Sequence, residues 1–338
     1  MIVANSRKKC PVTYSGVPPF FSLVDYRNNY FTSDDPNKII EFYNGFENRD
    51  QLIQWMRERP KGVTNIHEVE GDKEIIVVIP TADFNGKYAR ECRDNIFKGL
   101  HMIFVESGEI PDHYFNFAHN CNIGIIAALK YEPRWIIISN DDKILRDESS
   151  KLKDQIKRVD LNEISVLLPS NTVLGRISVQ NKLGIFAKSL FKGPDNVSDK
   201  ERELEVKYKV FFENKNLIQM LINKIFLRQI LRTWISGSFF IMSIQLCKKY
   251  YPEIFDETYI NGMEDVDLFL RFYVNNEKVT TIDYMVGDVI GGSFGKSVIR
   301  YRYFGVANRA YFNFKNKGLL TRLENSLKTD SDKEKIFK

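Results

Sequence analysis

Four short apolar runs constrain the fold of this chain more than any other feature. They are EIIVVIP (74–80), MIFVES (102–107), WIIIS (135–139) and EISVLLPS (163–170), and helical patterns separate them. Short runs rich in Ile and Val are typical of buried strands. Strands that alternate with helices predict an α/β fold with a mostly parallel sheet and helices on its faces.

The rest of the chain divides around this core. With 338 residues, 43% of them apolar, it can bury one large α/β domain with additions or two modest domains. Residues 1–70 mix aromatic irregular sequence with short helical patterns that end at Pro60 and Gly62, so we expect an appended N-terminal subdomain. We assign 71–320 to the α/β domain and 321–338 to a charged C-terminal helix or tail.

Charge and cysteine content indicate which partners and which cellular compartment to expect. The chain has 49 basic and 44 acidic residues, a net charge of +5 that is spread along the sequence, so nucleic acid is not an indicated partner. Its four cysteines form no CxxC pair and no secretory segment is recognisable, which predicts a cytoplasmic protein. No apolar stretch approaches the roughly 18 residues that span a bilayer, so any membrane contact would be peripheral.

The run WIIIS leads directly into Asn140, Asp141 and Asp142. In open α/β sheets the ligand crevice lies beyond the carboxyl ends of the strands. Two adjacent carboxylates repel one another there and need a cation or hydrogen-bond donors. A divalent cation such as Mn²⁺ or Mg²⁺, shared with a substrate phosphate, would meet that need. The alternative is a turn with a helix cap, in which Asn and Asp are also favoured.

Other strand ends add polar groups to the same expected edge. Pro80 and Thr81 close the first run and Glu106 closes the second, which suits a nucleotide cleft. In the helical segment that follows, Asn122 is predicted to cap the helix, and Gly124 allows it to approach the sheet closely.

A second acidic group lies in INGMEDVDLFLR. Glu264, Asp265 and Asp267 are followed by apolar Leu268, Leu270 and Phe272, which predicts a helix with three carboxylates in its first turn. A carboxylate fixed there can serve as a general base. Upstream, WISGSFFIMS predicts a small-residue turn at Gly237 that feeds an apolar strand, a possible floor beneath an acceptor.

Taken in order, IIVVIPT, VESG, NxNIGIIAA, WIIISNDD, WISGSFFIMS and FDETYINGMEDVDLFLR resemble the family 2 glycosyltransferases of the GT-A fold, particularly their rhamnosyltransferase-like branch. The resemblance covers about residues 74 to 315. It implies a GT-A type, Rossmann-like sheet and an inverting transfer of sugar from a nucleotide-diphosphate sugar to a hydroxyl acceptor, such as a glycan or lipid-linked glycan.

The resemblance also implies roles for residues. Asp142 matches the metal-binding aspartate, and Glu264 with Asp265 matches the pair that supplies the base, with Asp265 as our choice. Asp288 is nearest to a position where relatives carry a histidine that completes the metal shell; a glycine turn that closes over the diphosphate is the alternative. The nucleotide sugar would contact Pro80, Thr81, Glu106, Asn122, Asn140, Asp141 and Gly237.

Two other functions remain as alternatives. A sugar nucleotidyltransferase would share the α/β core, but a glycine-rich phosphate loop is expected after its first strand and PTADFNGK offers one glycine. A catalytically silent carbohydrate-binding or scaffold protein could use the same fold.

The segment ENKNLIQMLINKIFLRQILRTW (213–234) has apolar residues at helical spacing and several basic residues. We expect a helix that either packs on the core or lies on an anionic membrane and brings the site to a lipid-linked acceptor.

Overall fold

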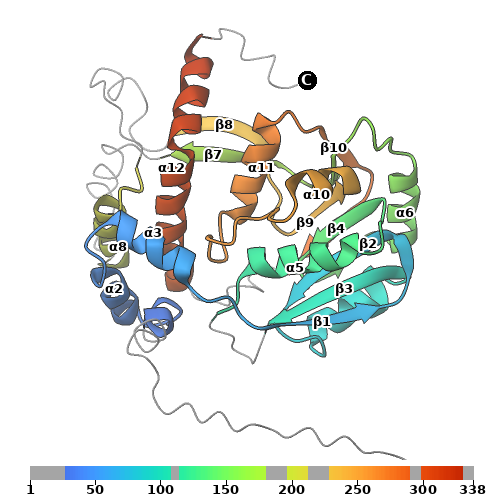
Figure 1. Ribbon diagram of the computed structural model, residues 1–338, viewed down its shortest axis with the longest axis horizontal. Coiled ribbons are helices and arrows are strands. Elements are labelled where there is room, and N and C mark those ends of the chain that lie inside the picture. The colour runs from blue at the N-terminus through green and yellow to red at the C-terminus, as the bar shows by residue number, and fades with distance from the viewer. Residues whose placement is uncertain (1–26, 108–113, 180–195, 212–227, 290–297, 330–338) are drawn as a thin grey trace, which may run out of the picture.

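A seven-stranded sheet forms the centre of the molecule (Figure 1). The computed structural model describes residues 27–107, 114–179, 196–211, 228–289 and 298–329. The strands are β1 (Thr64–Val69), β2 (Asp72–Thr81), β3 (Leu100–Ser107), β4 (Trp135–Ser139), β5 (Lys143–Leu145), β6 (Val166–Pro169), β7 (Leu174–Val179), β8 (Arg228–Trp234), β9 (Phe239–Ser243), β10 (Val279–Ile282) and β11 (Val286–Asp288).

The strand order of the central sheet is β1-β3-β2-β4-β9-β6-β10. Strands β3, β2 and β4 are parallel neighbours, and so are β6 and β10. Only β1 and β9 are antiparallel to their neighbours, so five of the seven strands run in one direction. All four apolar runs form strands of this sheet, which confirms the predicted mostly parallel α/β core.

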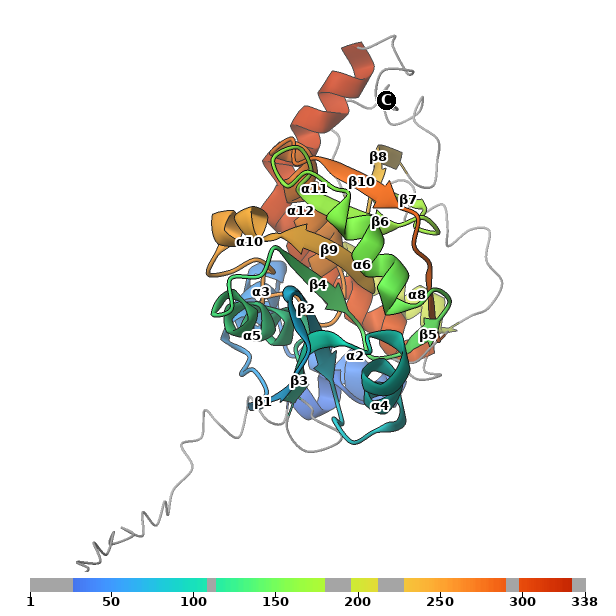
Figure 2. The ribbon, with the colours of Figure 1, turned by 90° about the vertical axis from the view of Figure 1, so that its right-hand side faces the viewer.

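Helices cover both faces of the sheet (Figure 2). The helices of the described residues are α2 (Pro36–Asn44), α3 (Arg49–Glu58), α4 (Lys87–Glu91), the π-helix η1 (Cys92–Ile96), α5 (Phe117–Leu129), α6 (Ser149–Lys157), α8 (Asn196–Lys207), α10 (Ile244–Tyr250), α11 (Glu264–Val274) and α12 (Val298–Thr329). Successive side chains of a strand point to opposite faces. Ile76 and Val78 of β2 therefore pack with α5, α10 and α11, while Ile75 and Val77 pack with α4, η1 and α6.

Gly124 brings α5 close to the sheet, as its sequence position predicts. A Cβ atom added to Gly124 would lie 2.3 Å from Cγ1 of Val78 and 3.0 Å from Cγ2 of Val105. A larger residue would push the helix away from β2 and β3. The close approach fixes the distance between α5 and the carboxyl ends of these strands.

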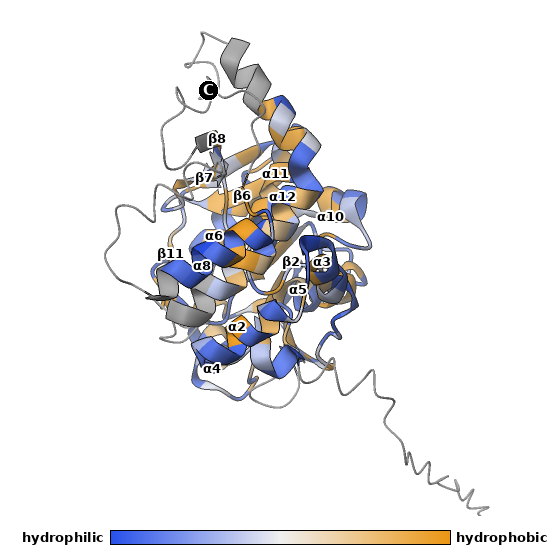
Figure 3. Ribbon diagram, turned by 90° about the vertical axis from the view of Figure 1, so that its left-hand side faces the viewer, coloured by the Kyte–Doolittle hydropathy of each residue, from blue (hydrophilic) through white to orange (hydrophobic). Residues whose placement is uncertain are grey.

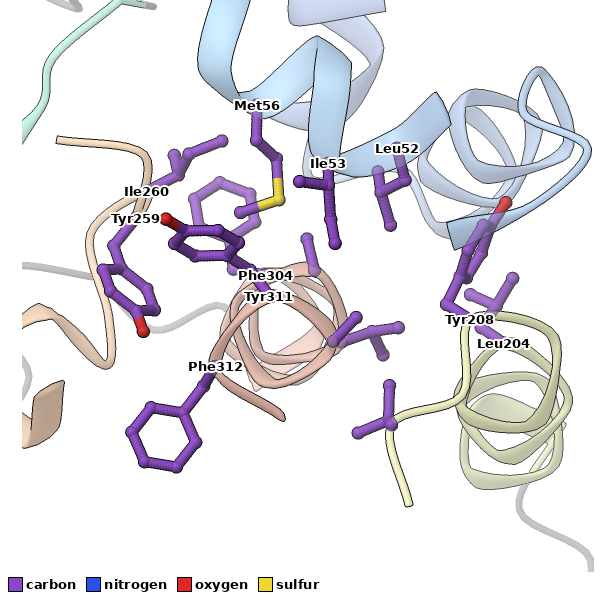
Figure 4. Close-up of a cluster of buried hydrophobic side chains, with 14 of the residues drawn as sticks. Leu52, Ile53, Met56, Leu204, Tyr208, Tyr259, Ile260, Phe304, Tyr311 and Phe312 are labelled. Carbon is purple, nitrogen blue, oxygen red and sulfur yellow. The ribbon is translucent and has the colours of Figure 1, made fainter. Parts of the chain in front are cut away.

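A separate apolar cluster joins the N-terminal helices to the C-terminal one. Leu52, Ile53 and Met56 of α3 pack with residues of α8 and α12 (Figure 4). The outward faces of α3 and α8 are hydrophilic, which matches their place at the surface (Figure 3). Residues 64–69, which the sequence analysis assigns to the N-terminal subdomain, form edge strand β1 of the central sheet. At the other end of the chain, residues 321–329 continue α12 as a helix.

The helix predicted over 213–234 is wrong for its last seven residues. Residues 228–234 form strand β8, which pairs antiparallel with β7; residues 212–227 lie outside the described part of the chain. Ile230 and Leu231 are both buried, although they are neighbours, and both belong to the apolar cluster that contains Ile177. None of the helices in the described ranges has the length and apolar character needed to cross a membrane.

Candidate functional site

The carboxyl ends of β2 and β4 meet at one edge of the sheet, because the two strands are parallel neighbours. Thr81 ends β2, and its hydroxyl donates a 2.7 Å hydrogen bond to the carboxylate of Asp141 beyond β4. Two polar residues that lie 60 positions apart in the sequence therefore form one local structure. This is the edge at which the sequence places a ligand crevice.

Backbone hydrogen bonds hold the loop that carries the two aspartates. The N–H of Asn140 donates to the carbonyl of Ser238 at 3.0 Å, and the carbonyl of Asp142 accepts from the N–H of Val289 at 2.9 Å. The thiol of Cys92 donates to the carbonyl of Asp141 at 3.2 Å. The loop is thus fixed by the residue before β9, by the residue after β11 and by η1.

Burial affects the protonation of Asp141. It raises the pKa of Asp141 above its ordinary value, and the adjacent charge of Asp142 acts in the same direction, while the Thr81 hydroxyl lowers it. Asp142 is itself buried. The side-chain oxygen of Asn140 is buried without a hydrogen-bond partner among the described residues. The loop therefore carries two carboxylates and one side-chain amide at consecutive positions beyond β4.

Lys143 follows the aspartates and forms an ion pair with Asp288. Strands β5 and β11 pair so that Lys143 lies opposite Asp288, and the lysine ammonium contacts that carboxylate. The Lys143 side chain is 0% exposed and that of Asp288 is 51% exposed. Burial lowers the pKa of Lys143, and the charges of Asp288 and Asp142 oppose this shift. Asp288 thus lies beside the strand-end loop and forms an ion pair with Lys143.

The predicted acidic helix is α11, which begins at Glu264 and carries Glu264, Asp265 and Asp267 in its first turn. Asp265 accepts a 2.8 Å hydrogen bond from the N–H of Val266. Its carboxylate lies against Gly237, since a Cβ atom added there would be 2.5 Å from Oδ2 of Asp265.

Gly237 and Ser238 therefore connect the two acidic groups. Ser238 binds the backbone of Asn140 on one side, and Gly237 contacts Asp265 on the other. The predicted turn and strand are confirmed, because Phe239–Ser243 forms β9. The glycine is needed for the close approach of the Asp265 carboxylate.

The first-turn carboxylates of α11 have different surroundings. Burial raises the pKa of Glu264 to about 8, and the charge of Asp265 contributes to that rise. Burial also raises the pKa of Asp265, against the hydrogen bond from Val266. Asp267 is fully buried but accepts from Tyr259, Lys315 and Asn316. Glu264 is suited to hold a proton near neutral pH, and Asp267 ties α11 to α12.

The remaining predicted nucleotide-binding residues lie near this edge but have protein partners. Pro80 is buried in β2, where it pairs with Val105 of β3. Glu106 accepts hydrogen bonds from the N–H of Phe84 at 2.9 Å and from His67 at 2.8 Å. The Phe84 N–H holds the pKa of Glu106 below its ordinary value. Glu106 thus orders the segment after β2.

The capping role predicted for Asn122 is wrong. Helix α5 begins at Phe117, and its cap is Asn116, whose side chain accepts from the N–H of His119. Asn122 lies inside the helix and is buried; its amide binds the N–H and carbonyl of Phe255, both at 2.9 Å. Asn116, an earlier asparagine in the same segment, provides the cap. The spacing of apolar residues does not show which of the two asparagines begins the helix.

Sequence reasoning missed several supporting residues. Lys143, Cys92 and Asn308 carry contacts to the site or its loops, and only Lys143 had a signal, its position directly after the aspartates. Within the described part of the chain, no three His, Cys, Asp or Glu side chains are grouped to hold a metal ion.

Neither family models nor the curated proteins contain a match to this sequence.

Proposed function

We propose that this chain is an inverting glycosyltransferase that moves a sugar from a nucleotide-diphosphate sugar to a hydroxyl acceptor. One observation carries the proposal: an aspartate pair beyond a parallel strand and an acidic helix start meet across Gly237 and Ser238 at a single sheet edge. The order of the sequence motifs that resemble family 2 glycosyltransferases supports it. A donor site and a base for the acceptor need such proximity.

Asp265 is the proposed base. It removes the proton of the acceptor hydroxyl as that oxygen attacks the anomeric carbon and the bond to the diphosphate breaks. A pKa raised by burial improves a carboxylate in this role, because it brings its basicity closer to working pH. Glu264, with a pKa of about 8, keeps its proton and limits the negative charge beside Asp265.

Asp141, Asp142 and Asn140 are the proposed donor-binding residues. The unpartnered oxygen of Asn140 would accept a hydroxyl such as that of a ribose. The two carboxylates fit a divalent metal shared with the diphosphate, since Mg²⁺ is usually held by one or two carboxylates together with substrate phosphates rather than by a full protein cage. When bound, Mn²⁺ or Mg²⁺ would stabilise the charge of the leaving diphosphate. Asp288 would become a ligand only by leaving Lys143.

The proposed acceptor is defined by its chemical class, a glycan or a lipid-linked glycan. The sequence-based case for a membrane helix over 213–234 loses its last part to strand β8, so contact with a membrane does not rest on that helix.

A screen of nucleotide sugars tests the proposal. Each donor is added to the full chain with Mn²⁺, with Mg²⁺ or with chelator, and the melting temperature is measured, because a ligand that binds only the folded state raises it. We expect at least one nucleotide-diphosphate sugar to stabilise the protein only with metal. Donor hydrolysis or transfer to a hydroxyl acceptor then separates an enzyme from a silent carbohydrate-binding protein. Stabilisation by free sugar but by no nucleotide would contradict the proposal.

A further inference from the structure

The loop that leads into α11 has an unusual backbone. Asn261 has a φ of 50° and Met263 a φ of 72°, so two residues other than glycine lie in the left-handed region within three positions. Such conformations cost free energy and persist only where the surrounding structure enforces them. They directly precede Glu264 and Asp265. The loop geometry therefore determines where the helix begins and where Asp265 points.

One side of the loop is held by Asn308 of α12. Its side-chain oxygen accepts from the N–H of Ile260 at 2.9 Å, and its side-chain nitrogen donates to the carbonyl of Ile260 at 2.9 Å. Asn308 is 1% exposed, so water does not compete with this pair of bonds. Gly262 also faces it, since an added Cβ atom would lie 3.2 Å from the Asn308 amide nitrogen. The amide fixes the backbone one residue before the first left-handed position.

The other side of the loop is held by the start of α5. Asn116 donates to the carbonyls of Glu257 at 2.9 Å and Tyr259 at 3.0 Å. Asn261 accepts from the N–H of Phe117 at 2.9 Å. The loop is therefore held between the start of α5, which packs on the sheet, and α12.

Helix α12 is braced in turn by the N-terminal helices. Ile260 and Tyr259 lie beside α12 and Met56 of α3 (Figure 4). The hydroxyl of Tyr43, from α2, accepts from the N–H of Ala307 at 3.3 Å, one residue before Asn308. The N-terminal helices thus contact the turn of α12 that grips the loop.

We propose that Asn308 is a positioning residue for Asp265, and that α2 and α3 support the site through it. The assignment rests on the proposed function, because it gives the loop geometry a catalytic purpose. Asn308 keeps the left-handed turn closed, and the closed turn keeps the Asp265 carboxylate against Gly237. Without it the donor site beyond β4 is unchanged, but the base is no longer held where the acceptor attacks.

The test compares Asn308→Ala with Asn313→Ala. Asn313 lies on the same helix, is 9% exposed and donates from its amide to a loop carbonyl, that of Val210, at 2.6 Å. It differs in holding a loop at the end of α8 rather than the loop before α11. For Asn308→Ala we expect kcat to fall about tenfold to a hundredfold, as for a misplaced reacting group, with KM for the donor and donor binding within about twofold of wild type. Asn313→Ala should keep kcat.

A second readout does not depend on activity. Hydrogen exchange of the amides in 260–267 should accelerate at least tenfold in Asn308→Ala and remain unchanged in Asn313→Ala. If Asn308→Ala does not fold, Asn308→Asp retains the bond from Ile260 N–H and should show a smaller change of the same kind. Unchanged exchange, or equal losses of kcat and donor affinity, would overturn the positioning role. If exchange is faster in Asn308→Ala but the wild-type protein transfers no sugar, Asn308 does hold the loop and the proposed function is wrong.

Discussion

The two acidic pairs at this sheet edge are compensated in different ways. Asp141 receives the Thr81 hydroxyl, and Asp142 has the buried ammonium of Lys143 nearby. Glu264 is buried without a lysine or arginine among the causes that shift its pKa, and its Oε2 has no hydrogen-bond partner in the described ranges. A bound cation would keep the strand-end pair charged, whereas the helix-start pair is suited to hold and transfer a proton. Environment, rather than residue type, separates the roles.

Asp265→Asn should have the largest effect. The substitution keeps the shape of the side chain but removes the base, so kcat should fall by about three to four orders of magnitude. Donor binding, measured by calorimetry with metal, should remain close to wild type. If turnover persists in this variant and Glu264→Gln abolishes it, the two helix-start residues have exchanged roles.

Asp142→Ala tests the strand-end pair. Unlike Asp265→Asn, it should weaken donor binding. We expect a loss of about a thousandfold in rate, or about 4 kcal/mol, together with loss of metal-dependent donor binding. Asn140→Ala removes the acceptor amide but keeps both carboxylates, so its donor binding should weaken and still depend on metal. Full activity of the wild-type protein in excess chelator would remove the metal from the proposal.

The positions of both acidic groups could be predicted from the sequence, because each group adjoins a strand or helix with a clear pattern of apolar residues. The run WIIIS is short and apolar, so it predicts a buried strand. The residues that follow it therefore lie at the carboxyl end of that strand. The apolar residues Leu268 and Phe272, four positions apart, likewise fit the helix that begins with Glu264. Local patterns were sufficient in both places.

Contacts between distant segments were not predictable in the same way. The segment 228–234 is apolar and basic with no turn signal. Its pairing with β7, whose residues lie 49 to 60 positions earlier in the sequence, decides that it is a strand. Asn122 and Asn308 likewise bind backbone groups that only the folded chain brings near. The pairing of Lys143 with Asp288 depends on the register of β5 with β11.

Glu264→Gln tests the proton-holding side of the comparison through stability. The folded pKa of Glu264 is about 8 and its ordinary value is 4.5, so the folded state binds the extra proton between these limits. Wild-type stability should therefore fall as pH rises from about 4.5 to 8. Glutamine carries no proton to lose, so the stability of the variant relative to wild type should rise by about 4 kcal/mol between pH 4.5 and pH 8.

Denaturant unfolding at both pH values provides the measurement. Asp141→Asn is the matched comparison, because burial raises the pKa of Asp141 as well but the Thr81 hydroxyl opposes the shift. Its gain at pH 8 should be smaller. A Glu264→Gln variant whose advantage over wild type is the same at both pH values would show that Glu264 is ionised in the folded protein.

Gly237→Ala should have the smallest effect and acts where the two pairs meet. The added methyl group would lie 2.5 Å from Oδ2 of Asp265, and the atom it meets is the end of a movable side chain. The carboxylate can turn away, so the free energy of unfolding should change by no more than about 1 kcal/mol. The turned carboxylate no longer faces the acceptor, so kcat should fall about tenfold with donor affinity retained. Steady-state kinetics with donor titration measures both. An active variant with normal kcat would mean that the contact between Gly237 and Asp265 does not set the position of the base, and that the strand-end and helix-start groups act independently.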